Sequence, residues 1–178
     1  ECSGLLVVDE AYVEFATETA LPLLARSPNV VLLRTFSKAF GLAGMRLGYL
    51  LAHPRLSRLF AEKVQYPYPV NTFAVRLARL LLEAYDEVRA VLESVKRERE
   101  WLRAELNALG VRAFPSQANF VLFEVGDRAR AVWQHLAEHG LRVKYVGEVL
   151  GYGACLRATV GSRETNQALI ARIREVLG

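Results

Sequence analysis

The chain has 178 residues, of which 52% are hydrophobic and 24% are charged, and its formal net charge is +4. These values are typical of a globular protein and exclude a disordered chain, and the length suffices for one large domain or two small ones. Because the charge is modest and arginines are interleaved with glutamates along the predicted helices, the composition argues against a nucleic-acid partner.

The sequence also argues against a membrane or secreted protein. No apolar run approaches the roughly 18 residues that a membrane span requires. The first residues, ECSGLLVVDEA, lack the basic start and the long apolar core of a secretory signal. Cys2 and Cys155 stand far apart without metal-ligand spacing, which suits a reducing cytoplasm better than a disulfide framework. We therefore expect a cytoplasmic protein without a membrane partner.

The first predicted element is a strand over residues 5–9. Leu5 to Val8 are consecutive apolar residues, as in a strand that is buried on both faces of a parallel sheet. Asp9 lies at the carboxyl end of this strand, where such sheets place ligand-binding groups. A carboxylate there requires a positively charged partner. The alternative is an ordinary acid at a strand end, with Tyr12 as an aromatic plug.

A short helix near 20–25 and a second buried strand over 29–36 lead into a lysine-containing loop. In the segment LRTFSKAFGLAGMRLGY, Lys38 follows Thr35 and Ser37, small residues come next, and Arg46 lies eight residues after the lysine. The alternative to a functional loop is a surface loop with a solvated lysine and arginine.

These residue types suit pyridoxal phosphate. A lysine amine can form a Schiff base with an aldehyde cofactor, and hydroxyl groups and a guanidinium can bind its phosphate. The protonated pyridine nitrogen of the same cofactor would be a positively charged partner for Asp9. The phenol of Tyr12 could donate a hydrogen bond to its 3-oxygen.

Residues 47–52 predict a third strand, antiparallel or angled to the first two because the connection is short. Helical periodicity follows over 54–64, and the prolines of QYPYPVN (65–71) end it. Asn71 is expected to cap the next helix, TFAVRLARLLLEAY.

Residues 86–109 predict one long amphipathic helix that Gly110 ends. Its acidic and basic residues are spaced to pair along one face, so the run KRERE favours a solvated helix face over a nucleic-acid patch. Strands and helices then alternate, as in a small α+β layer. The predicted strands are 118–125, 141–146 and 155–161, and the predicted helices are 127–139 and 163–177, the last capped by Ser162.

Two features of this second half raise the question of a ligand. Arg157 lies in a predicted strand among apolar neighbours and needs an anionic partner, either a structural carboxylate or an acidic group of a substrate. His135 and His139 are four residues apart on a predicted helix. No third ligand follows nearby, so we expect these histidines, and His53, to be solvated residues and predict no metal site.

Together the stretches VVDEAYVEF, RTFSKAFGLAGMRLGY, PSQANFVLF and CLRATVG resemble the fold-type I pyridoxal-phosphate enzymes of aminotransferase class I and II. Within that group these motifs are most similar to those of the histidinol-phosphate aminotransferases. The resemblance implies an α/β fold: part of a large cofactor-binding domain with a mostly parallel sheet over 1–85, an interdomain helix over 86–110 and a small α+β domain over 111–178. It also implies that the chain is the C-terminal half of such an enzyme, with an incomplete and inactive site on its own.

The resemblance implies roles for individual residues. Lys38 is the catalytic lysine, which binds the cofactor and then moves a proton between the substrate α-carbon and the cofactor. Arg157 meets the acidic end of the substrate, and Asn119 lies near the substrate or is only a turn residue at a strand edge. Lys144 stands where an arginine that aids substrate recognition is common, with Arg142 on the same strand face. The expected cofactor-binding residues are Asp9, Tyr12, Thr35, Ser37, Lys38 and Arg46.

The function implied is amino transfer between histidinol phosphate and 2-oxoglutarate in histidine biosynthesis, by a homodimer with residues near 66–71 close to a shared site. An aromatic-amino-acid aminotransferase and a threonine-phosphate decarboxylase share the lysine loop and remain alternatives. A further alternative is a non-catalytic piece that serves in dimerisation or binding.

Overall fold

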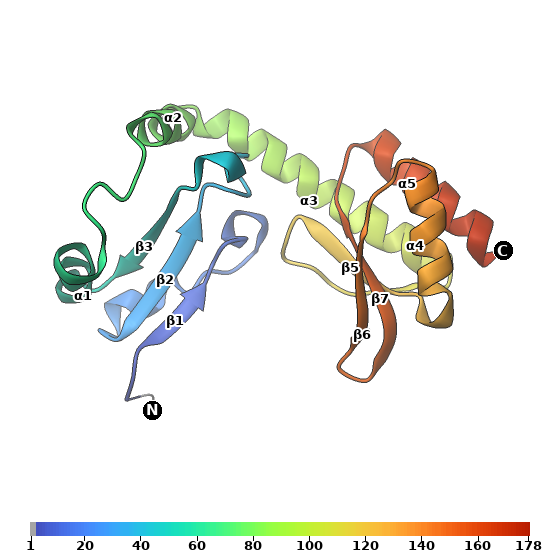
Figure 1. The fold of residues 1–178 in the computed structure, drawn as a ribbon, viewed down its shortest axis with the longest axis horizontal. Coiled ribbons are helices and arrows are strands. Elements are labelled where there is room, and N and C mark those ends of the chain that lie inside the picture. Colours follow the sequence, from blue (N-terminus) through green and yellow to red (C-terminus); the bar gives the residue numbers. More distant parts are fainter. Residues whose placement is uncertain (1–2) are drawn as a thin grey trace. The chain divides into compact units, whose positions relative to one another are not determined.

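The computed structural model describes residues 3–178, so Cys2 lies outside the described residues. The chain divides into two compact units, Glu1–Leu92 and Glu93–Gly178, which we call the N-terminal unit and the C-terminal unit. The boundary falls within helix α3 (Tyr85–Ala108), which the sequence predicted to within one residue at each end (Figure 1).

The N-terminal unit contains a three-stranded sheet in the order β1-β2-β3. Strand β1 (Leu6–Asp9) runs parallel to β2 (Val30–Thr35), and β3 (Gly48–Ala52) pairs antiparallel with β2. All three strands and both pairing directions agree with the sequence prediction. The central strand β2 is the buried one, since its first three residues are almost completely covered.

The prediction that the first strand is buried on both faces is wrong for β1. Leu6 is 42% exposed and Val7 is 54% exposed. Among residues 3–178, β1 pairs on one side only, whereas β2 has a partner on each side. Asp9 is therefore exposed at the end of an edge strand.

Short helical segments and two longer helices complete this unit. Asn71 caps α2 (Thr72–Glu83) as predicted, since its Oδ1 accepts hydrogen bonds from the N–H groups of Phe73 and Ala74, at 2.8 and 3.4 Å. Ala74 and Ala78 of α2 pack against Phe36 and Leu47, which flank the lysine loop. The segments are the 3₁₀ turns Val13–Phe15, Leu21–Ala25 and Ala43–Met45, helix α1 (Pro54–Leu59) with its π-helical continuation Phe60–Val64, and α2 (Thr72–Glu83).

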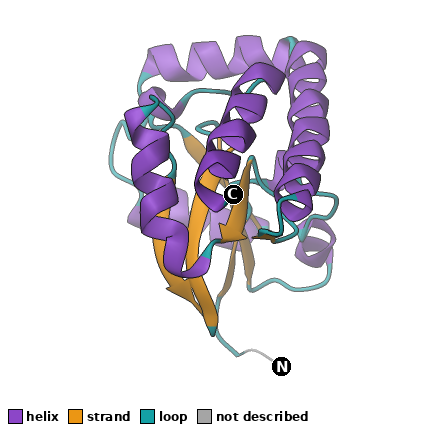
Figure 2. Ribbon diagram, turned by 90° about the vertical axis from the view of Figure 1, so that its right-hand side faces the viewer, coloured by secondary structure: helices purple, strands orange, loops and turns teal. Residues whose placement is uncertain are grey.

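The C-terminal unit is an antiparallel sheet of four strands in the order β4-β5-β7-β6, with helices packed on one face (Figure 2). Its core combines residues of α3, α4 (Ala129–Glu138) and α5 (Arg163–Leu177) with alternate residues of β5 (Phe120–Glu124) and β7 (Tyr152–Thr159). The elements are β4 (Arg112–Ala113), β5 (Phe120–Glu124), the 3₁₀ turn Gly126–Arg128, α4 (Ala129–Glu138), β6 (Lys144–Val149), β7 (Tyr152–Thr159) and α5 (Arg163–Leu177).

This unit is the α+β layer that the sequence predicted, but the bounds of its strands differ: β5 begins two residues later than predicted, and β7 begins three residues earlier. Strand β6 begins three residues later than the predicted start at 141, so Arg142 precedes the strand. The short strand β4 was not predicted, because two residues carry no periodic signal. No helix in residues 3–178 has the length and apolar character needed to cross a membrane.

Candidate active site

The lysine loop is closed by backbone hydrogen bonds at the end of β2. The Phe36 N–H donates to the Leu47 carbonyl at 3.1 Å, and the Leu42 N–H donates to the Phe36 carbonyl at 3.0 Å. Gly41 adopts a left-handed conformation with φ 68°, which a glycine adopts without steric cost. Its N–H donates to the Lys38 carbonyl at 3.2 Å, so this turn fixes the backbone that carries the lysine.

Lys38 and Tyr12 come together, although they lie on different loops. Lys38 Nζ is 5.4 Å from the centroid of the Tyr12 ring, which is within cation–π range. Both loops follow the carboxyl ends of parallel strands, because Asp9 of β1 is in register with Leu33 of β2. The edge of a parallel sheet where ligand groups gather is thus the place where the lysine and the tyrosine meet.

Asp9 differs from its expected setting. Its Oδ1 accepts a hydrogen bond from the Ala11 N–H at 2.9 Å, which turns the chain toward Tyr12. Within residues 3–178 no cationic side chain forms an ion pair with Asp9. Asp9 is thus not buried as expected, whereas its contact with a protonated pyridine nitrogen remains a prediction.

Thr35, Ser37 and Arg46 line one pocket of about 740 Å³ in the N-terminal unit. The Thr35 hydroxyl donates to the Leu47 carbonyl at 3.3 Å and accepts from the Ser37 N–H at 3.0 Å. One guanidinium nitrogen of Arg46 donates to the Ala43 carbonyl at 3.0 Å. Its other N–H donors and the Ser37 hydroxyl make no hydrogen bond with the described residues and can serve an anion.

The backbone of Arg46 is strained. Its φ is 52°, a left-handed conformation that costs a residue with a side chain about 1–2 kcal/mol. The residue ends the 3₁₀ turn Ala43–Met45 and leads into β3. Strain of this kind gathers at ligand sites, and here it accompanies the arginine that lines the pocket with two hydroxyl residues.

Sequence reasoning missed the ion pair between Glu10 and Arg34. Glu10 is 8% exposed, and one of its oxygens lies 2.8 Å from an Arg34 guanidinium nitrogen. Burial alone raises the pKa of Glu10, but hydrogen bonds from the Ala20 N–H, the Thr19 hydroxyl and Arg34 together outweigh it and lower the pKa. The pairing follows from the register of the two strands, which only the structure reveals: Asp9 pairs with Leu33, and Glu10 and Arg34 are the next residues.

A second acid in the N-terminal unit was also missed. Glu14 lies in the 3₁₀ turn after β1, and its Oε2 is buried without a hydrogen-bond partner among the described residues. Burial raises the pKa of this carboxyl group. The sequence offers no signal for it, because a glutamate in a short turn is ordinarily solvated.

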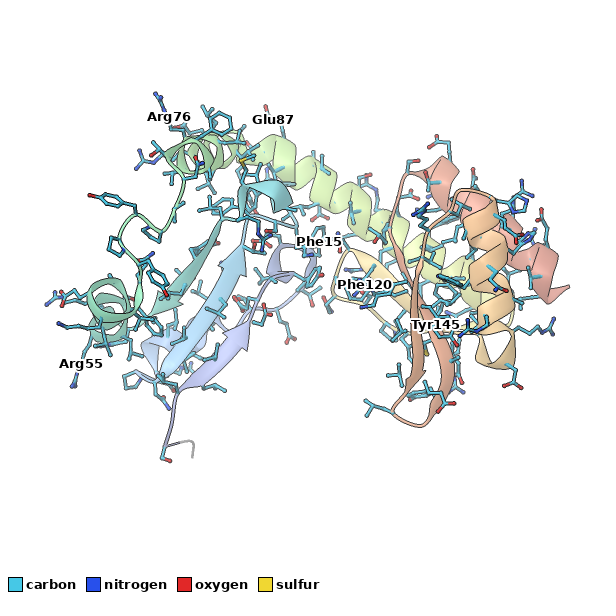
Figure 3. All side chains as sticks on the ribbon, viewed as in Figure 1. Phe15, Arg55, Arg76, Glu87, Phe120 and Tyr145 are labelled. Carbon is cyan, nitrogen blue, oxygen red and sulfur yellow. The ribbon has the colours of Figure 1, made fainter. Side chains whose placement is uncertain are left out.

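In the C-terminal unit, Arg157 and Lys144 lie directly opposite each other on neighbouring strands. They are register partners in β7 and β6. The Arg157 guanidinium lies 4.7 Å from the centroid of the Phe120 ring, which is labelled in Figure 3. Within residues 3–178 no carboxylate forms an ion pair with Arg157. Like charges opposite each other destabilise a sheet, so an anion between them would be favoured.

Asn119 precedes β5 and is half-buried. Its carbonyl accepts from the Val160 N–H at 2.9 Å, which is a strand-edge contact. Its side chain makes no hydrogen bond with any other described residue, and therefore none with Arg157 or Lys144.

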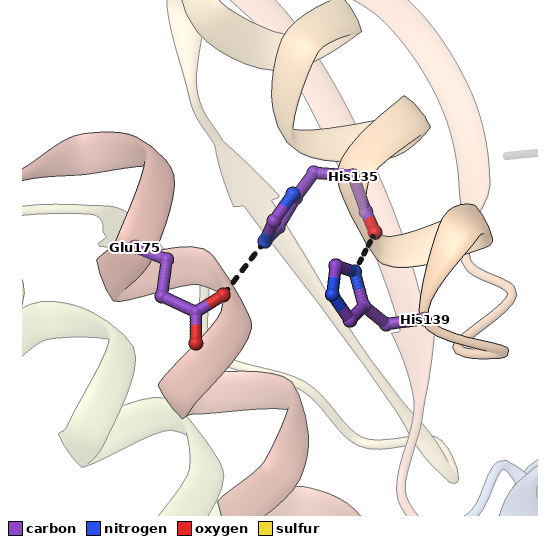
Figure 4. Close-up of side chains that lie close together, drawn as sticks. All are labelled: His135, His139 and Glu175. Atoms are coloured by element: carbon purple, nitrogen blue, oxygen red, sulfur yellow. Dashed lines mark hydrogen bonds and ion pairs between the residues drawn. The ribbon is translucent and has the colours of Figure 1, made fainter.

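The histidine pair meets a third group that sequence reasoning missed. His135 and His139 on α4 lie with Glu175 of α5 so that one possible ligand atom from each lies within 4.8 Å of the others (Figure 4). Glu175 thus supplies a third candidate ligand, which does not follow the histidines nearby in the sequence. Glu175 follows His135 by 40 residues, and no sequence motif of metal ligands predicts a contact over that separation.

Comparisons with known proteins identify the family. The sequence model for aminotransferase class I and II matches residues 1–173. The chain is 42% identical over 173 residues to histidinol-phosphate aminotransferase 1 of Carboxydothermus hydrogenoformans, covering 97% of this chain and 49% of that protein. It is 41% identical over 174 residues to the histidinol-phosphate aminotransferase of Streptomyces avermitilis, covering 97% and 46%. The chain thus spans about half the length of the curated relatives it matches.

Solved structures show the same fold. The histidinol-phosphate aminotransferase of Sinorhizobium meliloti, in complex with pyridoxal-5'-phosphate, matches with a TM-score of 0.85 at 33% identity, covering 97% of this chain and 48% of that one. The L-threonine-O-3-phosphate decarboxylase of Porphyromonas gingivalis matches with a TM-score of 0.81 at 25% identity, covering 96% and 54%. The predicted resemblance and the fold-type I class are confirmed. The chain belongs to the aminotransferase class I and II family.

Proposed function

We propose that this chain is the lysine-bearing part of a pyridoxal-phosphate-dependent aminotransferase that moves an amino group between histidinol phosphate and 2-oxoglutarate. The main support is the contact of Lys38 with Tyr12, together with a pocket that Thr35, Ser37 and Arg46 of the same loop region line. Identity of 42% to a histidinol-phosphate aminotransferase supports the substrate. In this proposal the reaction serves histidine biosynthesis.

The residues present fit the cofactor. The pocket of about 740 Å³ offers the Ser37 hydroxyl and the unused Arg46 N–H groups, which are donors of the kind that bind phosphate. In the proposed site Lys38 holds the aldehyde carbon, Tyr12 donates to the 3-oxygen and Asp9 meets the pyridine nitrogen. When bound, pyridoxal phosphate supplies an electron sink for the charge that develops at the substrate α-carbon.

In this proposal the chain's own groups move the proton and hold the anion. The amine of Lys38 takes the proton from the substrate α-carbon and returns it during transfer. Its position over the Tyr12 ring limits where the amine can go. Arg157 and Lys144, opposite each other in the sheet, bind the phosphate of one substrate and a carboxylate of the other. Asn119 would contact the substrate at the start of β5.

We also propose a homodimer. The segment 65–71 between α1 and α2 exposes aromatic side chains: Tyr66 is 83% exposed and Tyr68 is 98% exposed. Exposed tyrosines are frequent at protein interfaces, because one end of the ring is apolar and the other polar. Sedimentation of the intact protein tests this assembly, and a monomer at all concentrations would contradict it.

Borohydride reduction of the intact protein in the presence of pyridoxal phosphate, followed by peptide mass mapping, tests the cofactor assignment. We expect a pyridoxyl adduct on the peptide that contains Lys38 and none in Lys38→Ala. Lys38→Arg keeps the charge and should also lose the adduct. Lys96→Ala is the matched control, since Lys96 is a partly exposed residue of α3 that pairs with Glu93. An adduct that persists in Lys38→Ala would refute the assignment.

Product analysis tests the reaction. The intact protein should convert histidinol phosphate and 2-oxoglutarate into an oxo product and glutamate without release of CO₂. The decarboxylase among the matching structures keeps the alternative open that threonine phosphate is the substrate. Release of CO₂ from threonine phosphate would favour that alternative.

A further inference from the structure

The cluster formed by His135, His139 and Glu175 lies wholly within the C-terminal unit and contains none of the residues assigned to the aminotransferase site. Two imidazoles and a carboxylate are the ligand set that suits divalent transition metals, Zn²⁺ above all. We propose that these three side chains bind Zn²⁺ and that the ion links helix α4 to helix α5 (Figure 4).

His139 is oriented as a metal ligand. Its Nδ1 lies 2.8 Å from the carbonyl oxygen of His135. A carbonyl oxygen can only accept, so Nδ1 carries the proton and Nε2 keeps its lone pair. Metal-binding histidines are held in this way, with one ring nitrogen donating to a backbone carbonyl and the other facing the ion. The hydrogen bond thus selects the tautomer that the site needs.

His135 and Glu175 provide the other two ligands. His135 Nε2 lies 2.8 Å from Glu175 Oε2. Tetrahedral Zn²⁺, with bonds of about 2.0–2.2 Å, holds its ligand atoms about 3.4 Å apart, so the pair has to open only slightly. The side chains are 26% and 45% exposed and are free to make this change. Binding replaces the proton on His135 Nε2 with the ion, and that proton is released to solvent.

The remaining contacts support the site. Arg172 Nη1 donates to Glu175 Oε1 at 2.6 Å, which leaves Oε2 directed at His135. Metal-binding carboxylates are commonly hydrogen-bonded through the second oxygen. Three protein ligands leave the fourth position of a tetrahedral ion to water.

A hydrogen bond between two helices, without any metal, is the competing explanation. That contact needs His135 and Glu175 only, whereas the metal site also needs His139. The ring centroids of His135 and His139 are 4.4 Å apart. His139→Ala therefore separates the two explanations, because it removes one ligand and keeps the contact between the helices.

Calorimetric titration with zinc chloride tests the proposal on the intact protein without a polyhistidine tag. We expect one Zn²⁺ per chain. In His139→Ala and in Glu175→Gln the affinity should fall by more than a factor of about 10–100, which is the loss that removal of an outer-shell partner of a ligand already causes. Glu138→Gln is the matched control, since Glu138 is an exposed neighbour on α4 outside the cluster, and its affinity should equal that of the wild type.

Thermal unfolding gives a second measurement. Saturating Zn²⁺ should raise the melting temperature of the wild type and of Glu138→Gln, and a chelator should reverse the rise. His139→Ala should show no such rise. Zinc binding of equal affinity in wild type and His139→Ala would overturn the proposal, since the ion would then sit elsewhere. Absence of zinc binding by the wild type would overturn it as well and leave only the contact between the helices.

Discussion

Glu10 and Arg34 form an ion pair at the carboxyl end of β1 that is almost covered, with side chains 7% and 17% exposed. Removing one partner of such a pair leaves an uncompensated buried charge. Arg34→Leu should therefore lower the free energy of unfolding by about 3–5 kcal/mol, as measured by urea denaturation. Arg55→Leu, at an exposed arginine of α1 labelled in Figure 3, is the control and should change it by less than about 0.5 kcal/mol.

Because of the same ion pair, the free energy of unfolding should decrease as the pH falls. The pKa of Glu10 is lowered from 4.5 in the folded protein, so its ionised form stabilises the fold at pH values above the unfolded pKa. That stabilisation is lost as the pH falls through the folded pKa, below about 4.5. Glu10→Gln should lose less stability than the wild type between neutral and acidic pH. Equal losses in both proteins would contradict this assignment.

At the scale of helices and strands, the sequence predicted most elements because their signals are local. Apolar runs marked β2 and β3, helical periodicity marked α3 and α5, and Asn71 and Ser162 cap helices where they were expected to. Burial of β1 was mispredicted, because an apolar run does not reveal whether a strand lies at a sheet edge. The π-helical turn Phe60–Val64 has no signature of its own and was predicted as ordinary helix.

Gly48 shows how tightly β3 approaches β2. A Cβ atom at this position would lie 2.9 Å from the backbone carbonyl oxygen of Arg34. This distance is too short for a carbon–oxygen contact, so one of the two strands would have to shift. Gly48→Ala should lower the free energy of unfolding by about 1–3 kcal/mol, the usual cost of overpacking. Gly44→Ala is the matched control, because nothing lies within 4 Å of its added Cβ and its stability should not fall. Chemical denaturation of both variants measures the difference.

At the scale of the whole molecule, the sequence predicted which helix, strand or loop carries most candidate site residues. It did not predict which of these residues contact one another. Pairing of Lys144 with Arg157 depends on the register of β6 and β7, which contains irregularities after Tyr145 and Glu148. The contact of Lys38 with Tyr12 joins two loops, and Glu175 reaches His135 from another helix. Each of these contacts arises from tertiary packing, which spacing in one segment does not encode.

The division into two units has a measurable consequence for stability. Phe123 is fully buried in the core of the C-terminal unit, so Phe123→Ala should cost about 3–5 kcal/mol through lost burial and a cavity. Because the N-terminal unit has its own buried cluster around Phe36 and Leu47, the loss should remain within the C-terminal unit. Hydrogen exchange of the intact protein should then accelerate at amides of β5, β7 and α5 and stay unchanged at those of β2.

Val146, 38% exposed on β6, lies outside the buried core, and Val146→Ala should leave exchange in both units close to that of the wild type. Uniform acceleration across β2 and β5 in Phe123→Ala would mean that the chain unfolds as one cooperative body. Confined acceleration would mean instead that each unit is stabilised mainly by its own core, with α3 as the element that belongs to both.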